Sequence, residues 1–369
     1  MTSRPANHAG CLVALVGAIA ALLIAATPVV AQAPPHGAPA NTQPAEAHIE
    51  AAEATTPKPE QQRPSVWGEP TEVQIGIYVI DVDGVDSANQ NFSASVFVQA
   101  QWKMPLLRHE GPGPLIRRTT SVWTPGLVIV NQQQAWAAYP SFVEIAPDGT
   151  VTYRQKTWGW FSQPLNLREF PFDTQKLTVH IVAAGLREDE IKMLPLNKPD
   201  RPGSGLAREF SLPDFKVTNW RASAQPYIAY EGVPGVPGFI MEIDVERVPN
   251  YYIWKVIFPL CLIIMMSWVP RWLDPTEGGT SIGISTTSLL TLVAYLFAIM
   301  VLLPRVSYLT RMDQFILIST VLVFAALVQT VATVVLAKSG QTNLVSWINW
   351  VSRFVYPIVL LVVLAIAFA

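Results

Sequence analysis

The stretch from Ile282 to Leu303 constrains the fold of this chain most, because it runs for 22 residues without a charged side chain. A helix of that length matches the hydrocarbon thickness of a bilayer. Three more stretches of the last 120 residues are comparably apolar. Residues 250–369 are therefore predicted to form a transmembrane domain of four helices, at about 251–272, 280–303, 313–336 and 347–369.

The second of these segments is unusual for a membrane helix, because its first half is rich in hydroxyl side chains. One stripe at helical spacing, small and hydroxylic at one end and bulky at the other, consists of Gly283, Thr287, Leu290, Ala294 and Phe297. That stripe would suit the wall of a water-filled pore with a hydrophobic constriction. A second stripe of Ser281, Ser285 and Ser288 fits the spacing almost as well. The hydroxyls equally suit hydrogen bonds to a neighbouring helix, so the segment alone leaves the choice open.

The N-terminal residues indicate export. A basic residue, Arg4, precedes an apolar run, and small residues follow that run at cleavage spacing. Residues 1–31 are therefore predicted to be a signal peptide, with a retained anchor helix as the alternative. Residues 32–65 are rich in Ala and Pro and are predicted to be a disordered linker. The domain that follows would then lie outside the cytoplasm.

Residues 66–249 are predicted to form an antiparallel β-sandwich. Short runs of alternating apolar and polar residues, rich in β-branched side chains, are separated by Pro, Gly and Asp. They lie at 72–80, 92–102, 127–131, 142–145, 150–157, 176–183, 215–223 and 239–247. No amphipathic helical pattern of any length interrupts them, which favours a sandwich.

Composition excludes several functions. The formal net charge is −2, so there is no basic face for nucleic acid. The two cysteines, Cys11 and Cys261, lie in apolar segments, so no disulfide is expected in the soluble domain. The five histidines show no metal-ligand spacing, and no nucleophile–base pair or phosphate loop is present. We therefore expect neither an enzyme nor a cofactor.

A proline-centred motif, Phe170-Pro171-Phe172-Asp173, resembles the signature loop of pentameric ligand-gated ion channels, the Cys-loop receptor family. Further matches follow the family's order: Trp123-Thr124-Pro125 with Asn131, Arg247 before Pro249 and Tyr251-Tyr252, Pro259, Leu290–Tyr295, and Leu303-Pro304-Arg305. Gln163 and Leu177 stand where the loop's cysteines would be, so the chain is similar to the prokaryotic branch. The resemblance implies a ten-stranded sandwich above four helices, with five copies around a pore lined by the second helix.

The resemblance also assigns roles within the pore. The 14 residues from Leu290 to Pro304 match the family's spacing from its central hydrophobic ring, which selects the stripe through Leu290. Asp274 and Glu277 lie near the cytoplasmic mouth, where an acidic ring would favour cations. Gly278 and Gly279 add length that shifts Glu277 out of the family's register, and a solvated loop acid is the alternative.

The resemblance implies coupling and ligand sites as well. Coupling between sandwich and pore would involve Asp86, Phe170, Pro171, Phe172, Asp173, Arg247, Pro304 and Arg305. The agonist site would use Tyr227 and Tyr230 of the 225–238 hairpin, with Trp158 and Phe97 from the neighbouring subunit. Ala184 stands where the family carries an aromatic, and each of the four aromatics could instead belong to the sandwich core.

The sequence thus predicts a homopentameric, ligand-gated, cation-selective channel in a lipid bilayer. Its partners would be four identical subunits, permeant cations and a small-molecule agonist that the residues do not identify. The alternative is a non-conducting periplasmic sensor that signals through a membrane partner.

Overall fold

The computed structural model describes residues 58–64, 68–198, 201–274, 277–301, 303 and 305–368. The predicted signal peptide, the linker up to residue 57 and Pro304 lie outside these ranges. The last residues of the predicted linker are ordered, contrary to expectation, and include the short helix η1 (Pro59–Gln61). The Glu60 carboxylate accepts a hydrogen bond from Arg117 at 2.6 Å, and its carbonyl accepts one from the Trp123 amide at 2.8 Å. These distant partners, which composition does not reveal, hold the segment on the sandwich.

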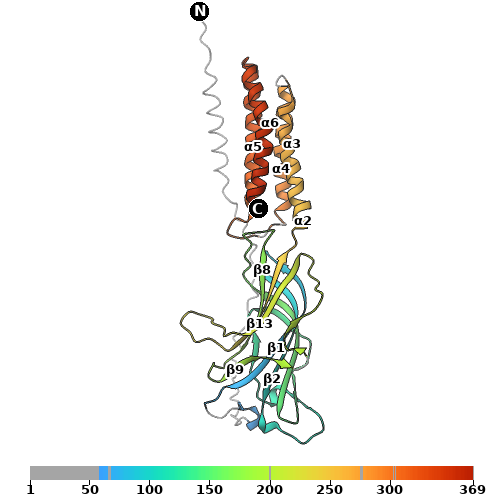
Figure 1. Ribbon diagram of the computed structural model, residues 1–369, viewed down its shortest axis with the longest axis vertical. Helices are drawn as coiled ribbons and strands as arrows, with labels where there is room; N and C mark the ends of the chain where they lie inside the picture. The colour runs from blue at the N-terminus through green and yellow to red at the C-terminus, as the bar shows by residue number, and fades with distance from the viewer. Residues whose placement is uncertain are drawn as a thin grey trace, which may run out of the picture. The chain divides into compact units, whose positions relative to one another are not determined.

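Two main sheets form the sandwich (Figure 1). The larger sheet has the order β12 (Gly205–Leu206), β1 (Thr71–Asp86), β2 (Asn91–Lys103), β7 (Thr150–Ser162), β6 (Phe142–Ile145), β3 (Leu115–Arg118), with β5 (Gln132–Ala137) beside β7 and β9 (Ile191–Pro195) beside β1. The smaller sheet has the order β13 (Phe215–Ala224), β14 (Gly238–Arg247), β8 (Thr174–Ala183), β4 (Leu127–Ile129). A hairpin of β10 (Asn197–Lys198) and β11 (Arg201–Pro202) is separate.

Alternating burial explains which strands the sequence reveals. In β8 the inward side chains of Leu177, Val179 and Ile181 are almost fully buried, and Phe92 of β2 stacks on Phe161 of β7 at 5.2 Å. All eight runs predicted from alternation are strands. The described residues form fourteen strands rather than the ten that the resemblance implies. The difference arises because several short pairings count as additional strands. β3 and β5 have no buried residue, so nothing in their sequence alternates.

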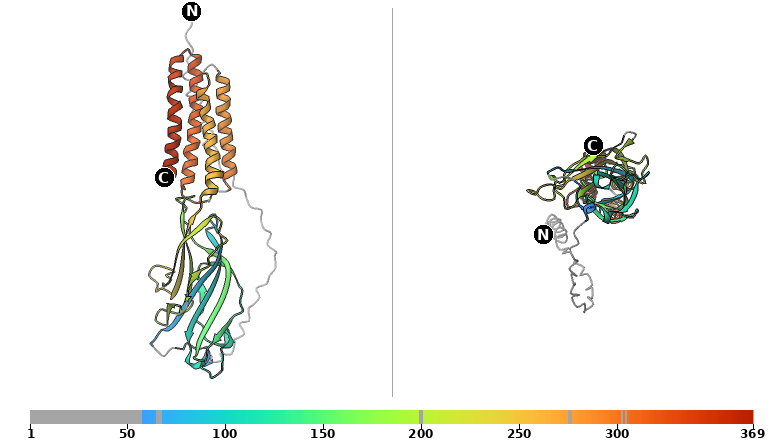
Figure 2. Two further views of the ribbon diagram at one scale, coloured as in Figure 1. Left: turned by 45° about the vertical axis from the view of Figure 1, so that its right-hand side comes forward. Right: turned by 90° about the horizontal axis from the view of Figure 1, so that it is seen from below.

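Four helical segments of the described chain are long and apolar enough to cross a membrane, and Figure 2 shows them side by side. They are Asn250–Trp272, α4 (Gly278–Ile299), α5 (Arg311–Lys338) and α6 (Thr342–Phe368). α4 begins two residues before its predicted start, with Gly278 packed on α5. A Cβ at Gly278 would lie 2.6 Å from Cγ1 of Val334, so only glycine allows this approach.

The first span is not one regular helix. It comprises α2 (Asn250–Tyr252), a π-helical turn η4 (Ile253–Ile257), α3 (Phe258–Trp268) and the 3₁₀ turn η5 (Val269–Trp272). Pro259 has no N–H to donate, so one carbonyl group of the preceding turn lacks its helical donor. The Tyr295 hydroxyl of α4 lies 2.9 and 3.0 Å from the carbonyl oxygens of Lys255 and Val256, so its single proton is donated to this pair. A side chain of α4 therefore compensates for the proline of the neighbouring span.

We predict that Tyr295→Phe lowers the stability of the solubilised protein by about 1 kcal/mol, because carbonyl groups inside the bilayer region lose their donor. Thermal unfolding in detergent measures this. Tyr251→Phe is the matched control, since the Tyr251 side chain is exposed. Equal midpoints for the two variants would contradict the role given to Tyr295.

Candidate functional site

The two hydroxyl-bearing stripes of α4 have different environments. Ser281, Ser285 and Ser288 are buried, with at most 5% of their surface exposed. Ser285 donates a hydrogen bond to the Thr330 hydroxyl of α5 at 3.0 Å, and Ser288 donates to the carbonyl of Ile284 at 2.8 Å. This stripe therefore packs α4 within its own subunit.

The other stripe is uncovered. Gly283, Thr287, Leu290, Ala294 and Phe297 are all exposed in the single chain. Leu290 and Phe297 are 68% and 69% exposed, although both are large and apolar. A row of this kind, with polar and small groups at one end and bulky groups at the other, is available to line a space shared with other copies of the chain.

The acidic residues predicted for selectivity directly precede α4. Asp274 and Glu277 are both exposed, and the Glu277 amide donates to the Asp274 carbonyl at 2.9 Å. The Glu277 carbonyl accepts a hydrogen bond from the Ser281 amide at 3.1 Å, so Glu277 is the residue at which the helix begins. Gly278 and Gly279 are thus the first helical residues rather than loop.

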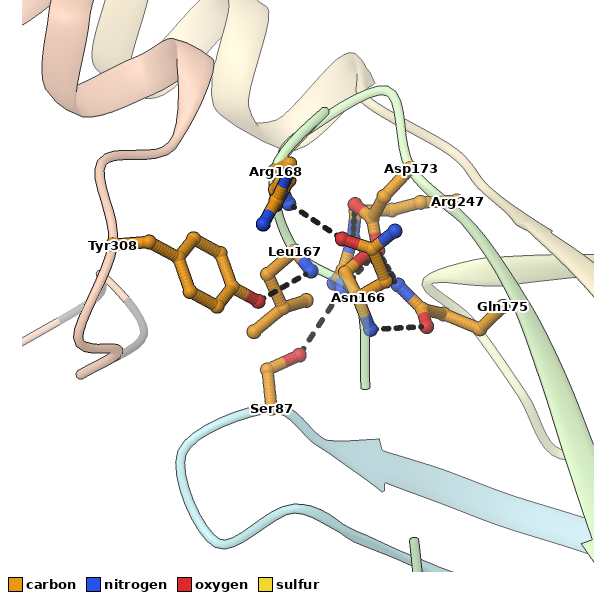
Figure 3. A network of polar contacts seen from close by, with 8 residues as sticks. All are labelled: Ser87, Asn166, Leu167, Arg168, Asp173, Gln175, Arg247 and Tyr308. Carbon is orange, nitrogen blue, oxygen red and sulfur yellow. Dashed lines mark hydrogen bonds and ion pairs between the residues drawn. The ribbon is translucent and has the colours of Figure 1, made fainter. Parts of the chain in front are cut away.

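A buried ion pair joins the last strand of the sandwich to the proline loop (Figure 3). The Arg247 guanidinium donates to the Asp173 carboxylate through Nε at 2.7 Å and Nη2 at 3.2 Å. Their side chains are 3% and 1% exposed. Two parallel hydrogen bonds between opposite charges are the strong arrangement for such a pair.

Neutral groups complete this pair. Arg247 lies 4.9 Å from the ring centre of Phe170 and 4.3 Å from that of Phe215, and it donates to the Ser87 hydroxyl at 3.0 Å. Gln175 donates at 2.6 Å to Oδ2 of Asp173, the oxygen that also accepts from Nη2 of Arg247. The residue of the β1–β2 turn that meets Arg247 is therefore Ser87.

Asp86, predicted as part of the coupling site, does not join this ion pair. Its carboxylate accepts hydrogen bonds from Ala88 and Asn89 and caps its own turn. Partial burial raises the pKa of Asp86, but the hydrogen bonds from Asn89 and Ala88 outweigh it and leave that pKa below its usual value. Asp86 therefore stays ionised and shapes the turn that presents Ser87.

The proline loop also holds the start of α5. The Leu167 amide donates to the Tyr308 hydroxyl at 2.9 Å, and the Met312 amide donates to the Phe170 carbonyl at 3.2 Å. The Arg311 amide donates to the Arg168 carbonyl at 2.9 Å, and its side chain pairs with Glu169 at 2.5 Å. The loop is thus bonded to the connection between α4 and α5, as Figure 3 shows for Tyr308.

The remaining loop residues contact the ends of two spans. The ring of Phe170 meets Tyr252 edge-on at 4.7 Å, and the ring of Phe172 lies 5.6 Å from Phe368 at the end of α6. Pro171 lies between these two residues in the sequence and is buried. The peptide bond that precedes it is cis. Arg305 is exposed and forms no ion pair within the described ranges, and Pro304 lies outside them.

Sequence reasoning missed Ser87, Tyr308 and Arg311 in this site. Their partners are far away in the chain, 141 residues for the Leu167–Tyr308 bond, so no local pattern announces them. The one local feature of Tyr308 and Arg311 is their place at the polar start of a long apolar segment, and it does not identify their partners.

The four aromatics predicted for the ligand site belong to two separate groups. Tyr230 is 74% exposed on the 225–238 hairpin, while Tyr227 bridges to Val236 at the base of that hairpin. Trp158 and Phe97 lie on the larger sheet, where Trp158 donates to Asp83 at 2.8 Å. None belongs to the buried core of the described sandwich, so the alternative of core packing does not hold. Within one chain, the structure brings no hairpin aromatic of the described part into ring contact with the other two.

His180 of β8 supports the hairpin. Its ring meets Tyr227 edge-on at 5.2 Å, and its Nε2 lies 3.1 Å from the carbonyl oxygen of Gln225. Burial lowers the pKa of His180 below its usual value of about 6.5, and the hydrogen bond with Gln225 only partly opposes this. The neutral imidazole is therefore the form that fits beneath the hairpin.

Comparisons with known proteins agree with this architecture. The neurotransmitter-gated ion-channel ligand binding domain matches residues 58–234, and the neurotransmitter-gated ion-channel transmembrane region matches residues 256–362. The chain belongs to the family of pentameric neurotransmitter-gated ion channels. Members of this family are ligand-gated channels with an extracellular ligand-binding domain and four transmembrane helices, and they are not enzymes.

Two relatives match most of this chain. A proton-gated ion channel of Gloeobacter violaceus is 24% identical over 312 residues, which cover 81% of this chain and 82% of that protein. A gamma-aminobutyric acid receptor subunit beta of Caenorhabditis elegans is 23% identical over 277 residues, which cover 72% of this chain. The aligned part spans half the length of the nematode subunit.

We predict that Arg247→Ala destabilises the protein by about 3–5 kcal/mol, because Asp173 would remain buried without its partner. Surface expression should fall, or the protein that reaches the surface should fail to open. Arg221→Ala is the control, since Arg221 pairs with Glu242 on an exposed face. Normal surface expression and normal currents for Arg247→Ala would refute the prediction.

A second prediction concerns pH. Because the folded-state pKa of His180 is depressed, the unfolded chain binds more protons in the window below about pH 6.5. Stability should therefore rise with pH through that window and level off above it. His180→Gln should weaken this pH dependence of the thermal midpoint, while the control His109→Gln keeps it. An unchanged pH profile in His180→Gln would contradict the assignment.

Proposed function

We propose that the chain forms a homopentameric ligand-gated ion channel, selective for cations, with α4 lining the pore. The observation that carries this proposal is the uncovered stripe of α4. It includes two large apolar side chains, Leu290 and Phe297, and most of the surface of each is exposed. Five copies around an axis would bring this stripe together, while the serine stripe stays packed on α5 within each subunit. The membership of the chain in a channel family supports the same arrangement.

Each part of the stripe has a physical role in this proposal. Rings of Leu290 and Phe297 would make a narrow, dewetted constriction that closes the pore to ions. Thr287 would offer hydroxyl groups to a partly dehydrated cation, and Gly283 would keep the cytoplasmic end wide. Asp274 and Glu277 would concentrate cations at that mouth, because five exposed carboxylates create a negative potential there.

Opening would be driven from the sandwich, which we place in the periplasm, with the helices in the cell membrane. The agonist would bind between subunits, under the hairpin that carries Tyr227 and Tyr230 and against Trp158 and Phe97 of the neighbour. Its binding would reach the pore through Asp173, Arg247 and the loop Phe170–Phe172. One relative is a proton-gated channel, so acidification is the first stimulus to apply.

The experiment is recording from purified protein in planar bilayers across a NaCl gradient, with stepwise acidification. We expect a conductance whose reversal potential lies toward the equilibrium potential of Na⁺. Leu290→Thr should conduct without any stimulus, since a ring of hydroxyls wets the constriction. Leu289→Thr is the matched control one position away, on the partly buried side of α4.

The outcomes separate the parts of the proposal. If purified Leu290→Thr stays silent although it assembles and reconstitutes as the unmodified protein does, the chain does not conduct through this stripe, and a sensor without a pore becomes the better explanation. A reversal potential toward Cl⁻ would refute cation selectivity. Glu277→Gln should reduce the preference for cations, whereas Glu231→Gln on the hairpin should leave it unchanged.

A further inference from the structure

A small polar cavity lies between η5, α4, α5 and α6. Its lining includes Arg271, Ser281, Gln329, Thr333 and Asn349, so hydrogen-bonding groups from four helical segments converge on it. About 10 Å³ is open to the centre of a water-sized sphere. That is room for one water molecule or one monatomic ion.

The charged residue of this cavity is deeply buried. Arg271 is 3% exposed. It donates to the carbonyl of Ser267 at 2.8 Å and to the side-chain oxygen of Gln329 at 3.0 Å, and it lies 4.6 Å from the ring centre of Tyr356. Its Nε is buried and has no hydrogen-bond partner in the described structure. Every group that accepts a hydrogen bond from this guanidinium is therefore neutral.

No carboxylate of the described residues forms an ion pair with Arg271. The neighbouring cation, Arg353, donates to the Arg271 carbonyl at 3.0 Å and adds further positive charge. Arginine does not release its proton in proteins, so the charge persists. An ion in a low-dielectric interior needs a counter-charge, as Asp173 provides for Arg247. The cavity beside Arg271 is where such a charge fits.

We propose that this cavity binds a monatomic anion of the chloride class, one in each subunit. The free Nε–H of Arg271 would donate to the anion, with the Ser281 hydroxyl and the Asn349 amide as further donors. A lipid phosphate carries the same charge but exceeds the volume of the cavity. Water fits but supplies no charge. The site does not depend on ion conduction, since it lies on the packed side of α4.

Such an anion would stabilise this end of the helix bundle. It would join η5 to the buried serine stripe of α4 and to α5 and α6, which carry Thr333 and Asn349. Removing the anion would leave Arg271 uncompensated between the four segments. The stability of the whole chain should therefore depend on which anion the buffer contains.

The first test compares thermal unfolding of the purified full-length protein in sodium chloride, sodium bromide and sodium gluconate at equal ionic strength, in phospholipid-free detergent. Gluconate is too large for the cavity. We expect a higher midpoint in either halide, saturating with halide concentration, and loss of this difference in Arg271→Gln. Lys338→Gln, which removes a positive charge near the same end of α5, should keep it. A halide effect that persists in Arg271→Gln would overturn the proposal.

The second test does not depend on any variant folding. Crystals of the unmodified protein grown in sodium bromide should show an anomalous peak beside the Arg271 guanidinium. Elongated density there without an anomalous signal would assign the site to a lipid headgroup and overturn the halide. An anomalous map without a peak at Arg271, in crystals that show bromide elsewhere, would also overturn it.

Discussion

The paired charges of Arg247 and Asp173 are the interaction on which the junction between sandwich and helices depends. Arg247 ends β14 three residues before the first span begins, so its charge sits where water is already excluded. Asp173 supplies the opposite charge from the proline loop, 74 residues earlier. Because either charge would be strongly destabilising if it were buried there without its partner, the pair fixes the loop against the strand. Phe170 packs on Arg247, contacts the ring of Tyr252 and accepts a hydrogen bond from the amide of Met312. It therefore links the ion pair to the first span and to the start of α5.

Inside the helical domain, hydrogen bonding of polar side chains within the chain determines which face of α4 is left free. Ser285 donates a hydrogen bond to Thr330. Tyr295 donates to the carbonyl group of Lys255, which lacks a donor because residue 259 is proline. Both bonds lie within one chain, so each removes a polar group from the exposed surface of α4. The hydroxyl of Thr287 remains on the uncovered side. A helix whose hydroxyl groups were all bonded within the chain would be an ordinary packed span. The exposed hydroxyl of Thr287 gives α4 a face that tolerates water.

The sequence predicted what local patterns encode. Alternation located the eight main strands, and uninterrupted apolar runs located the four spans, because burial on one face or in lipid leaves a periodic or continuous signature. It could not choose between the two stripes of α4 from the residues alone, since helical spacing is the same for a packed and an open face. It placed Asp86 in the coupling site, whereas the neighbouring Ser87 contacts Arg247. Tyr308 and Arg271 were not predicted, because their partners come from other segments and only the fold brings them together.

The position of these contacts indicates which part of α4 a movement of the sandwich would reach. Val301 and Leu303, just beyond the helix, line a cavity of about 470 Å³ together with Asp86 and Arg247. A displaced proline loop would pull on Tyr308 and Met312, and hence on this end of α4. The opposite half of the helix is held on α5 by Ser285 and by the close approach at Gly278. In the proposed channel, such a pull would act first on the end of α4 that carries Phe297, where the Tyr295 hydroxyl also links the helix to the first span. In the proposed channel, the bulky half of the stripe would thus be the part that follows the sandwich, and the hydroxyl-bearing half would be the part that stays in place.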